Sequence, residues 1–338
     1  MLDIENREVL IRYLTDKGVI SEQEDYKVEY CKGGVSCIAA LIEKPGRTML
    51  IKQGRPKLAV KEEWLADPAR MKIEAKANEV YNRYVPESVP AVIFYDDENF
   101  ILLREAAPAD CTMWKTDLLS GILDFEVAKK TIEALVTVHN KCYNDDEISR
   151  IFADDSIFYQ LRISPYIEFV LGKYPELGEY GARLIKRLRE RKHTLVHADY
   201  SPKNILVLKN RDICILDYEI SHYGDPVFDL AFFTNHIVLK SAHLGKWSAA
   251  FLNMLMYMTN TYFEMMSYDD PKTVEADCIK VLAMMMIARI DGKSPVEYIT
   301  EETTKQLVRD MAFRLFKSDI KSYRETAELF YSMEKKLA

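Results

Sequence analysis

The segment HADYSPKN at 197–204, together with an aspartate further along the chain, contains residue types that could transfer a phosphoryl group. Asp199 could accept the proton of an attacking hydroxyl, because a positioned carboxylate can serve as a general base. The side-chain oxygens of Asn204 and Asp217 could hold Mg²⁺ against the phosphates of ATP, since Mg²⁺ prefers oxygen ligands. Apolar runs flank both motifs, which predicts that these polar residues lie at strand ends in a cleft. The alternative interpretation is an acidic loop between two buried strands.

Residues 1–104 have the pattern of a small, strand-rich lobe. The stretches 26–55 and 91–104 alternate in polarity and contain β-branched residues, and Lys44-Pro-Gly-Arg47 predicts a turn within the first of them. Helices are expected within 1–20 and at 68–85.

The rest of the chain has the pattern of a larger and mainly helical lobe. Residues 105–121 are interpreted as a connector. Helices are predicted at 125–140, 178–191, 228–268 and 274–338, and short strands at 194–197, 205–208 and 213–216. The predicted fold class is therefore α+β, with two lobes: a nucleotide-binding lobe with a small antiparallel sheet at 1–104, and a helical catalytic and substrate lobe at 105–338.

The motifs occur in the order found in protein kinases, whose catalytic loop H-R-D-x-x-x-x-N is followed by D-F-G. More specifically, VHADYSPKNILV, ILDYE and GDPVFDLAFF resemble the aminoglycoside phosphotransferase and choline kinase superfamily over nearly the whole chain. Members of that superfamily phosphorylate small molecules on a protein-kinase-like fold. The resemblance implies ATP and Mg²⁺ as cofactors, and it implies that Asp229 supports the backbone of the catalytic loop. His197 is expected to orient that loop rather than to act as a base.

Parts of the chain are similar to the methylthioribose kinase family. The stretch LIKQGRPKLAVKEEWLADPARMKIEA and the motif Asp217-x-Glu219 carry this similarity, which implies that Glu219 helps to bind Mg²⁺ and phosphate. A solvated acid at a strand end is the alternative for Glu219. The segment 288–298 is also similar, but that family has an arginine pair for its sugar where this chain has Ala288 and Arg289. Arg289 is therefore the predicted substrate residue.

Lys52, near the end of a predicted strand, is the candidate for the lysine that binds the α- and β-phosphates of ATP. Glu74 in the following helix is the first candidate to hold its charge, and Glu79 is the alternative. A solvated lysine at a strand end is the other interpretation.

Two further segments are predicted to contact the nucleotide. Glycines between the first strands would let the backbone approach phosphates, although a plain hairpin turn is an equally simple interpretation. The connector is expected to bind adenine through its backbone groups. The predicted residues are Gly33, Gly34 and Ser36 in the first segment, and Arg104, Glu105 and Ala106 in the second.

The composition excludes several other classes of function. The 338 residues are 48% hydrophobic and 29% charged, with a net charge of -7 that disfavours nucleic-acid binding. The N-terminal segment lacks the apolar region of a signal peptide, and no stretch is apolar enough for a membrane helix. The six cysteines have no metal-ligand spacing. We therefore expect a cytoplasmic protein with a small-molecule substrate, without a nucleic-acid or membrane partner, and with a homodimer as one possible state.

Three functions are compatible with the sequence. The first is an ATP-dependent kinase that acts on the hydroxyl of a small molecule, with a methylthioribose-like sugar as the candidate acceptor. The second is a phosphotransferase for an aminoglycoside or a choline-like amino alcohol. The third is a non-catalytic protein of the kinase fold that binds a nucleotide or metabolite. A protein substrate is disfavoured because Tyr218 and Glu219 replace the F-G of D-F-G and no A-P-E segment follows.

Overall fold

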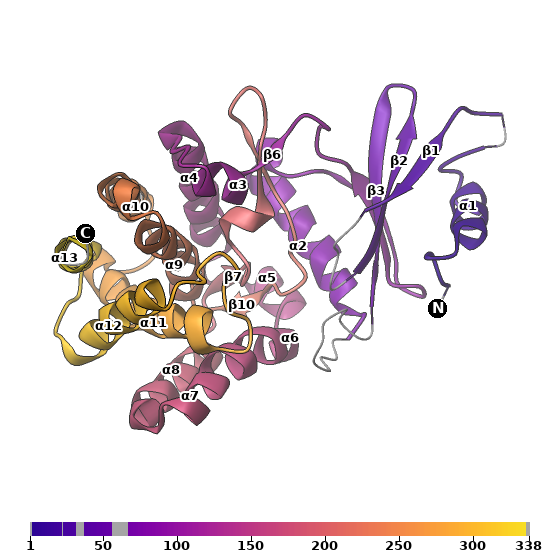
Figure 1. Cartoon of the computed structure of the whole chain (residues 1–338). Helices are drawn as coiled ribbons and strands as arrows, with labels where there is room; N and C mark the ends of the chain where they lie inside the picture. The colour runs from indigo at the N-terminus through magenta and orange to yellow at the C-terminus, as the bar shows by residue number, and fades with distance from the viewer. Residues whose placement is uncertain (1, 22, 32–36, 56–66, 336–338) are drawn as a thin grey trace. The chain divides into compact units, whose positions relative to one another are not determined.

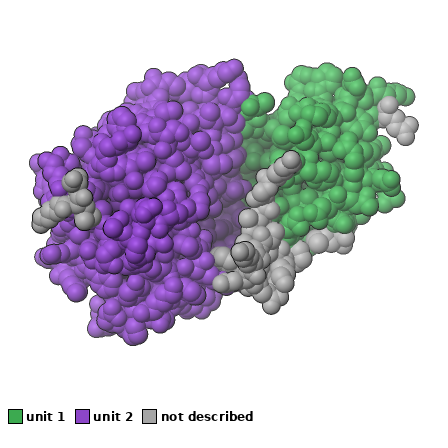
Figure 2. All heavy atoms as spheres, in the orientation of Figure 1, with its two compact units in different colours: residues 1–109 green, residues 110–338 purple. Residues whose placement is uncertain are grey.

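The structure is a computed structural model that describes residues 2–21, 23–31, 37–55 and 67–335. These residues form two compact units, 1–109 and 110–338 (Figure 2). The predicted lobe boundary after residue 104 remains a prediction, and the strand at that point continues through Glu105.

The first unit is built on a five-stranded antiparallel sheet with the order β1-β2-β3-β5-β4. Its strands are β1 (Lys27–Tyr30), β2 (Cys37–Lys44), β3 (Arg47–Gly54), β4 (Val92–Asp96) and β5 (Ile101–Glu105). The predicted turn between β2 and β3 is present, and Gly46 adopts φ 75°, a conformation that glycine reaches without a Cβ clash. The alternating polarity of these stretches therefore predicted the strands correctly.

Two helices lie on opposite faces of this sheet, α1 (Arg7–Asp16) and α2 (Arg70–Tyr84) (Figure 1). Ile51 of β3 belongs to the core that α1 covers with Leu10 and Leu14. Successive side chains of a strand point to opposite faces, so the next residue, Lys52, points toward α2. A short 3₁₀ turn, η1 (Pro86–Ser88), follows α2.

The second unit is mainly helical. Its helices before the catalytic loop are α3 (Trp114–Leu119), α4 (Phe125–Cys142), α5 (Asp146–Ile151), α6 (Ser156–Phe158), the π-helix η2 (Tyr159–Glu168), α7 (Phe169–Lys173), η3 (Pro175–Leu177) and α8 (Gly178–Glu190). Those after it are α9 (Val227–His243), η5 (Gly245–Trp247), α10 (Ser248–Met265), α11 (Pro271–Asp291), α12 (Glu302–Lys317) and α13 (Tyr323–Glu334).

The segment 105–121, predicted as a connector, contains two short elements that were not predicted, β6 (Thr112–Met113) and α3. The helix is stabilised by burial of its apolar face: Trp114 is 1% exposed and stacks on Phe233 with ring centroids 5.8 Å apart. Leu118, one turn later, is fully buried. Tertiary packing therefore fixes this short helix more than its local sequence does.

The centre of the second unit is α9, which is buried on nearly every side and packs against α10 and α11. A helix in this position is expected to be apolar all round. Three of its buried residues are nevertheless ionisable, namely Asp229, His236 and Lys240.

Short strands hold the predicted catalytic segment. They are β7 (Thr194–Val196), which pairs with β10 (His222–Gly224), and β8 (Ile205–Val207), which pairs with β6 and β9 (Ile213–Ile215). The three predicted strands are thus present, while β10 was not predicted. In the described part of the chain, no helix has the length and apolar character needed to cross a membrane.

Candidate active site

The loop after β7 contains a strained residue that Asp229 stabilises. Ala198 adopts φ 62°, a left-handed conformation that costs a non-glycine residue about 1–2 kcal/mol. The buried carboxylate of Asp229 accepts hydrogen bonds from the backbone N–H groups of His197 (2.7 Å) and Ala198 (2.8 Å). Hydrogen bonds to a charged group contribute about 1.5–3 kcal/mol each, so this carboxylate offsets the strain. Asp229 therefore has the supporting position expected from the sequence.

The ring of His197 links this loop to the next strand. Its Nδ1 accepts a hydrogen bond from the backbone N–H of Asp199 (3.2 Å), and its Nε2 donates to the carbonyl of Leu216 (3.1 Å). Burial lowers the pKa of His197, so the ring is neutral with its proton on Nε2. A ring with both nitrogens engaged in this way positions the loop and is not a candidate base.

Leu216 brings the two predicted metal ligands together. Its backbone N–H donates to the carbonyl of Asn204 (2.9 Å), while its own carbonyl accepts from His197. The next residue, Asp217, has φ 62° and so turns the chain sharply beside Asn204. Two residues distant in the sequence are thereby held at one end of the β8–β9 hairpin.

Asn204 ends the short 3₁₀ turn η4 (Pro202–Asn204), and its side chain is fixed by Asp199. The amide Nδ2 donates to the carbonyl of Asp199 (3.0 Å) and to its carboxylate Oδ2 (2.8 Å). With Nδ2 engaged, Oδ1 is the atom of Asn204 that could bind a cation.

The carboxylate of Asp199 lies between two cationic side chains, Arg162 and Lys203. Its Oδ1 is 2.5 Å from Nη2 of Arg162, and its Oδ2 is 3.0 Å from Nζ of Lys203. Burial alone would raise the pKa of Asp199, but Arg162 and then Lys203 outweigh burial and hold the pKa below its ordinary value. Asp199 is therefore ionised at neutral pH and can accept a hydrogen bond from a hydroxyl.

Arg162 is a site residue that sequence reasoning missed. It lies on the π-helix η2, and its Nε donates to the carbonyl of Ala198 (2.6 Å) while Nη2 pairs with Asp199. Its guanidinium lies 5.4 Å from the ring of Tyr166 and 5.2 Å from that of Phe232. One side chain thus holds both the strained backbone and the carboxylate. An arginine between the apolar residues of QLRIS was the available signal.

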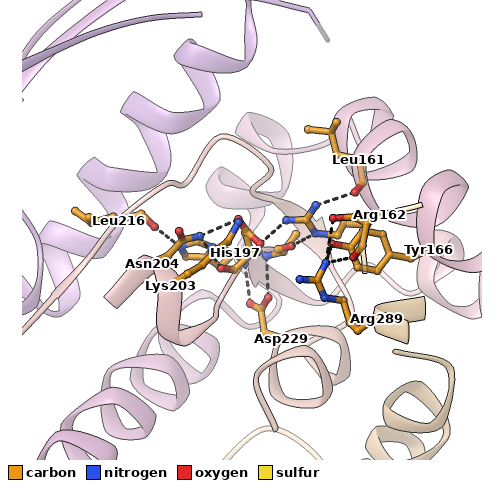
Figure 3. A network of polar contacts seen from close by, with 12 residues as sticks. Leu161, Arg162, Tyr166, His197, Lys203, Asn204, Leu216, Asp229 and Arg289 are labelled. Carbon is orange, nitrogen blue, oxygen red and sulfur yellow. Dashed lines mark hydrogen bonds and ion pairs between the residues drawn. The ribbon is translucent and has the colours of Figure 1, made fainter. Parts of the chain in front are cut away.

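Arg289, the predicted substrate residue, belongs to the same network (Figure 3). Its Nη1 donates to the hydroxyl of Tyr166 (2.9 Å) and to Oγ of Ser294 (3.1 Å). Burial would raise the pKa of Tyr166, but Arg289 and Arg162 outweigh it and lower the pKa below its usual value. The contacts connect Arg289 to Asp199 through Tyr166 and Arg162, while its contact with a substrate remains a prediction.

In the first unit, Lys52 forms a buried ion pair with Glu74. The Nζ atom lies 2.7 and 2.9 Å from the two carboxylate oxygens, and the residues are 3% and 1% exposed. The other candidate, Glu79, pairs with Lys76 on the surface of α2. The predicted pairing of Lys52 with Glu74 is therefore present, while its binding of phosphates stays a prediction.

The predicted adenine-binding segment is constrained by the sheet. The backbone N–H of Glu105 donates to the carbonyl of Ala91 (2.9 Å), and that of Ala106 donates to Thr48 (3.0 Å). Adenine recognition at Arg104–Ala106 would therefore use carbonyl groups rather than these two N–H groups. The predicted phosphate-loop residues, Gly33, Gly34 and Ser36, lie outside the described residues.

The oxygen donors near the catalytic loop fit a magnesium ion that also binds nucleotide phosphates. Mg²⁺ is usually held by one or two protein ligands together with phosphate oxygens and water. Asn204 and Asp217 can supply such a pair, and Glu219, 8% exposed, follows two residues later. Among the residues that the structure describes, no three His, Cys, Asp or Glu side chains gather closely enough to form a metal site by themselves.

Comparisons with known proteins agree with this geometry. Residues 155–255 match the model of the phosphotransferase enzyme family. The chain is 22% identical over 281 residues to a methylthioribose kinase of Bacillus cereus (strain B4264), an alignment that covers 75% of this chain and 70% of that protein.

Two solved structures are similar over nearly their whole length. A choline/ethanolamine kinase family protein from Mesorhizobium loti has a TM-score of 0.52 and 14% identity, covering 97% of this chain and 94% of that one. The GDP and kanamycin complex of APH(2")-IIia has a TM-score of 0.53 and 13% identity, covering 93% and 99%. The resemblance stated from the sequence and the predicted kinase-like α+β fold are thereby confirmed.

Proposed function

We propose that this chain, a phosphotransferase with a hydroxyl acceptor, is an ATP-dependent kinase of a small molecule. The observation that carries the proposal is the fixed arrangement of Asp199, Asn204 and Asp217 within the segment that matches the phosphotransferase family. Each of the three has the atoms that phosphoryl transfer requires at its position.

Asp199 would orient the acceptor. Its ionised carboxylate accepts a hydrogen bond from the acceptor hydroxyl and directs the oxygen lone pair at the γ-phosphorus. Because Arg162 and Lys203 keep its pKa low, Asp199 is a weak base in the ground state. In a loose transition state the hydroxyl proton becomes acidic only as the O–P bond forms. The proton then moves to Asp199, while the bond from the γ-phosphorus to the bridging oxygen of ADP breaks.

Charge neutralisation would come from the metal and from side chains already in place. Mg²⁺ held by Asn204, Asp217 and Glu219 would draw charge from the β- and γ-phosphates. In the first unit, Lys52, aligned by Glu74, would bind the α- and β-phosphates. This division of roles follows from the contacts of each residue within its own unit.

The acceptor class is supported only by similarity. A methylthioribose-like sugar is the first candidate, because the chain is 22% identical to a methylthioribose kinase. An aminoglycoside or a choline-like amino alcohol is the alternative suggested by the names of the similar structures. A non-catalytic binding protein would have no need for the combination of Lys52, Asp199, Asn204 and Asp217.

A panel assay tests the proposal. The full chain is incubated with MgATP and single acceptors, including methylthioribose, kanamycin and choline, and both ADP and the phosphorylated acceptor are measured by mass spectrometry. We expect ADP and phosphate ester in equal amounts with at least one hydroxylated acceptor. ADP formed at the same rate with and without every acceptor, or no ADP at all, would contradict the proposal.

A further inference from the structure

A row of side chains on one face of α9 leads from Arg162 beside the catalytic loop to Lys240. Phe232, His236 and Lys240 are spaced four residues apart, so they lie on one face of the helix. The ring of Phe232 contacts both the guanidinium of Arg162 (5.2 Å from the ring centre) and the ring of His236 (centroids 5.2 Å apart). This face of α9 therefore connects Lys240 to Arg162, the ion-pair partner of Asp199.

Lys240 is buried, and none of the described carboxylates forms an ion pair with it. It is 1% exposed, and its Nζ donates to the carbonyl of His236 in its own helix (3.3 Å). Nζ also lies 5.1 Å from the centre of the Tyr298 ring. No ion pair with an acid involves this lysine in the described parts of the chain. Lysine is almost never fully buried without a partner, because removing its charge from water is costly.

The groups around Lys240 are mostly positive. Lys115 lies over the same Tyr298 ring (6.0 Å), and Arg289 also acts on Lys240. Among the described residues that shift Lys240, one is an acid, Glu297, and it is paired with Lys115. Burial, followed by Lys115 and Arg289, lowers the pKa of Lys240 to about 7, and Glu297 opposes this only weakly. Burial, followed by Lys240 and Arg289, lowers the pKa of His236, so this ring is neutral.

Two buried polar atoms in this cluster have no hydrogen-bond partner among the described residues. They are the hydroxyl oxygen of Tyr298 and Nε of Arg289. Buried donors are normally satisfied, and leaving them unpaired lowers stability. A methionine at position 240 would fill similar space without the charge, so packing alone does not explain the lysine. A bound anion would satisfy the hydroxyl, the guanidinium and the ammonium together.

We propose that Lys240, His236, Arg289 and Tyr298 form a pocket for an anionic group, a carboxylate or a phosphate, on the hydroxylated acceptor whose hydroxyl Asp199 binds. The proposal rests on the kinase function proposed above and narrows its acceptor class. It favours acidic sugars and hydroxy acids over aminoglycosides and choline, because a buried cationic pocket repels a cationic ligand.

Anion binding can be measured without turnover. Inorganic phosphate and D-glycerate are titrated separately into the full chain without nucleotide, and binding is followed by thermal unfolding, since a ligand of the folded state raises its Tm. The proposal predicts that at least one of the two raises the Tm, and that Lys240→Met weakens this binding by roughly 10- to 100-fold, as expected for loss of a charge-assisted contact.

Matched variants separate this pocket from general electrostatics. Lys246→Met removes an exposed lysine just after α9 and should bind the anion as the unaltered chain does. Tyr298→Phe removes only the hydroxyl of Tyr298 and should also weaken anion binding. This second variant keeps the proposal testable if Lys240→Met misfolds. Equal anion binding by the unaltered chain, Lys240→Met and Tyr298→Phe, or loss of binding in Lys246→Met as well, would overturn the proposal.

Turnover then separates this proposal from the kinase function. Acceptors are supplied in pairs, ribose 5-phosphate with ribose and glycerate with glycerol, alongside choline and kanamycin. We expect the acidic member to be preferred, and Lys240→Met to raise its KM more than it lowers kcat; the preferred pair identifies phosphate or carboxylate. If neutral or cationic acceptors are preferred and Lys240→Met leaves their KM unchanged, the pocket assignment is wrong and the kinase function stands. If anions bind through Lys240 and no acceptor is phosphorylated, the pocket stands and the kinase function fails.

Discussion

Replacing Arg162 by methionine should damage both the stability and the pH profile of the protein. The change removes the ion pair with Asp199 (2.5 Å) and the hydrogen bond to the carbonyl of Ala198 (2.6 Å). Removal of one partner from a buried pair typically costs about 3–5 kcal/mol. Lys203 and Asn204 still contact the carboxylate, so we expect about 3 kcal/mol, the lower end of that range.

The sign of the pH effect follows from the pKa of Asp199. Arg162 and Lys203 lower this pKa below its ordinary value of 3.8, so the ion pair stabilises the fold above that pH and this contribution is lost as the pH falls. Without Arg162, the effect of burial is less well balanced by nearby cations, so the pKa of Asp199 rises. The acidic limb of the kcat/KM profile should therefore move to higher pH in Arg162→Met.

Two measurements check this prediction, namely urea unfolding at pH 7 and the pH dependence of kcat/KM. Arg162→Lys keeps the positive charge but lacks the planar guanidinium, which contacts two groups at once. Its losses of stability and its shift of the acidic limb should therefore be intermediate. Arg189→Met is the matched control, because this arginine also lies over an aromatic ring, that of Tyr159, but is exposed; it should change stability by no more than about 0.5 kcal/mol. If Arg162→Met unfolds like the control and keeps the acidic limb of the unaltered chain, the reasoning is refuted.

Four further predictions concern buried ionisable groups. Lys52→Met should destabilise the fold by about 3–5 kcal/mol by removing the buried cation beside the carboxylate of Glu74, and adding Glu74→Gln should recover much of the loss in urea unfolding; no recovery would contradict the pair. Burial raises the pKa of Glu334 to about 7, so stability should fall by about 3 kcal/mol as the pH rises from 4.5 to 7, and Glu334→Gln should remove this slope. Burial lowers the pKa of His222 to about 4, so thermal unfolding should show stability falling as the pH drops from 6.5 to 4; a flat Tm over that range would argue against a buried neutral ring. Lys240→Met should raise the free energy of unfolding at pH 7, because the free protein no longer buries an unpaired cation; a loss of stability would contradict this.

Much of the site could be predicted because its signals are local. The spacing of Asp199, Asn204 and Asp217 and the apolar runs around them depend on neighbouring residues, and the structure has strands where those runs occur. The pairing of Lys52 with Glu74 follows from a strand and a helix with clear periodicity. Local patterns were sufficient for the elements that carry these residues.

The parts that were missed depend on tertiary packing. Arg162 acts from a π-helix, whose widened turn has no simple pattern in the sequence. Lys240 lies in a helix that is buried on nearly every side, so its sequence resembles that of an ordinary core helix. The N–H groups of Glu105 and Ala106 are engaged by strand pairing, which the residues of the connector do not reveal.

The most direct test of the proposed chemistry is the rate of γ-phosphoryl transfer from ATP to an acceptor, compared between the unaltered chain and Asp199→Asn. Asparagine keeps the shape of the side chain but cannot take the hydroxyl proton, and removal of a general base typically slows a reaction by about 10²–10⁴-fold. Asp212→Asn, at an exposed carboxylate of the β8–β9 turn that pairs with Lys130, is the control and should keep its rate. We predict a loss in this range for Asp199→Asn with ATP affinity retained. Full turnover by Asp199→Asn would contradict the role of Asp199 and with it the proposed mechanism.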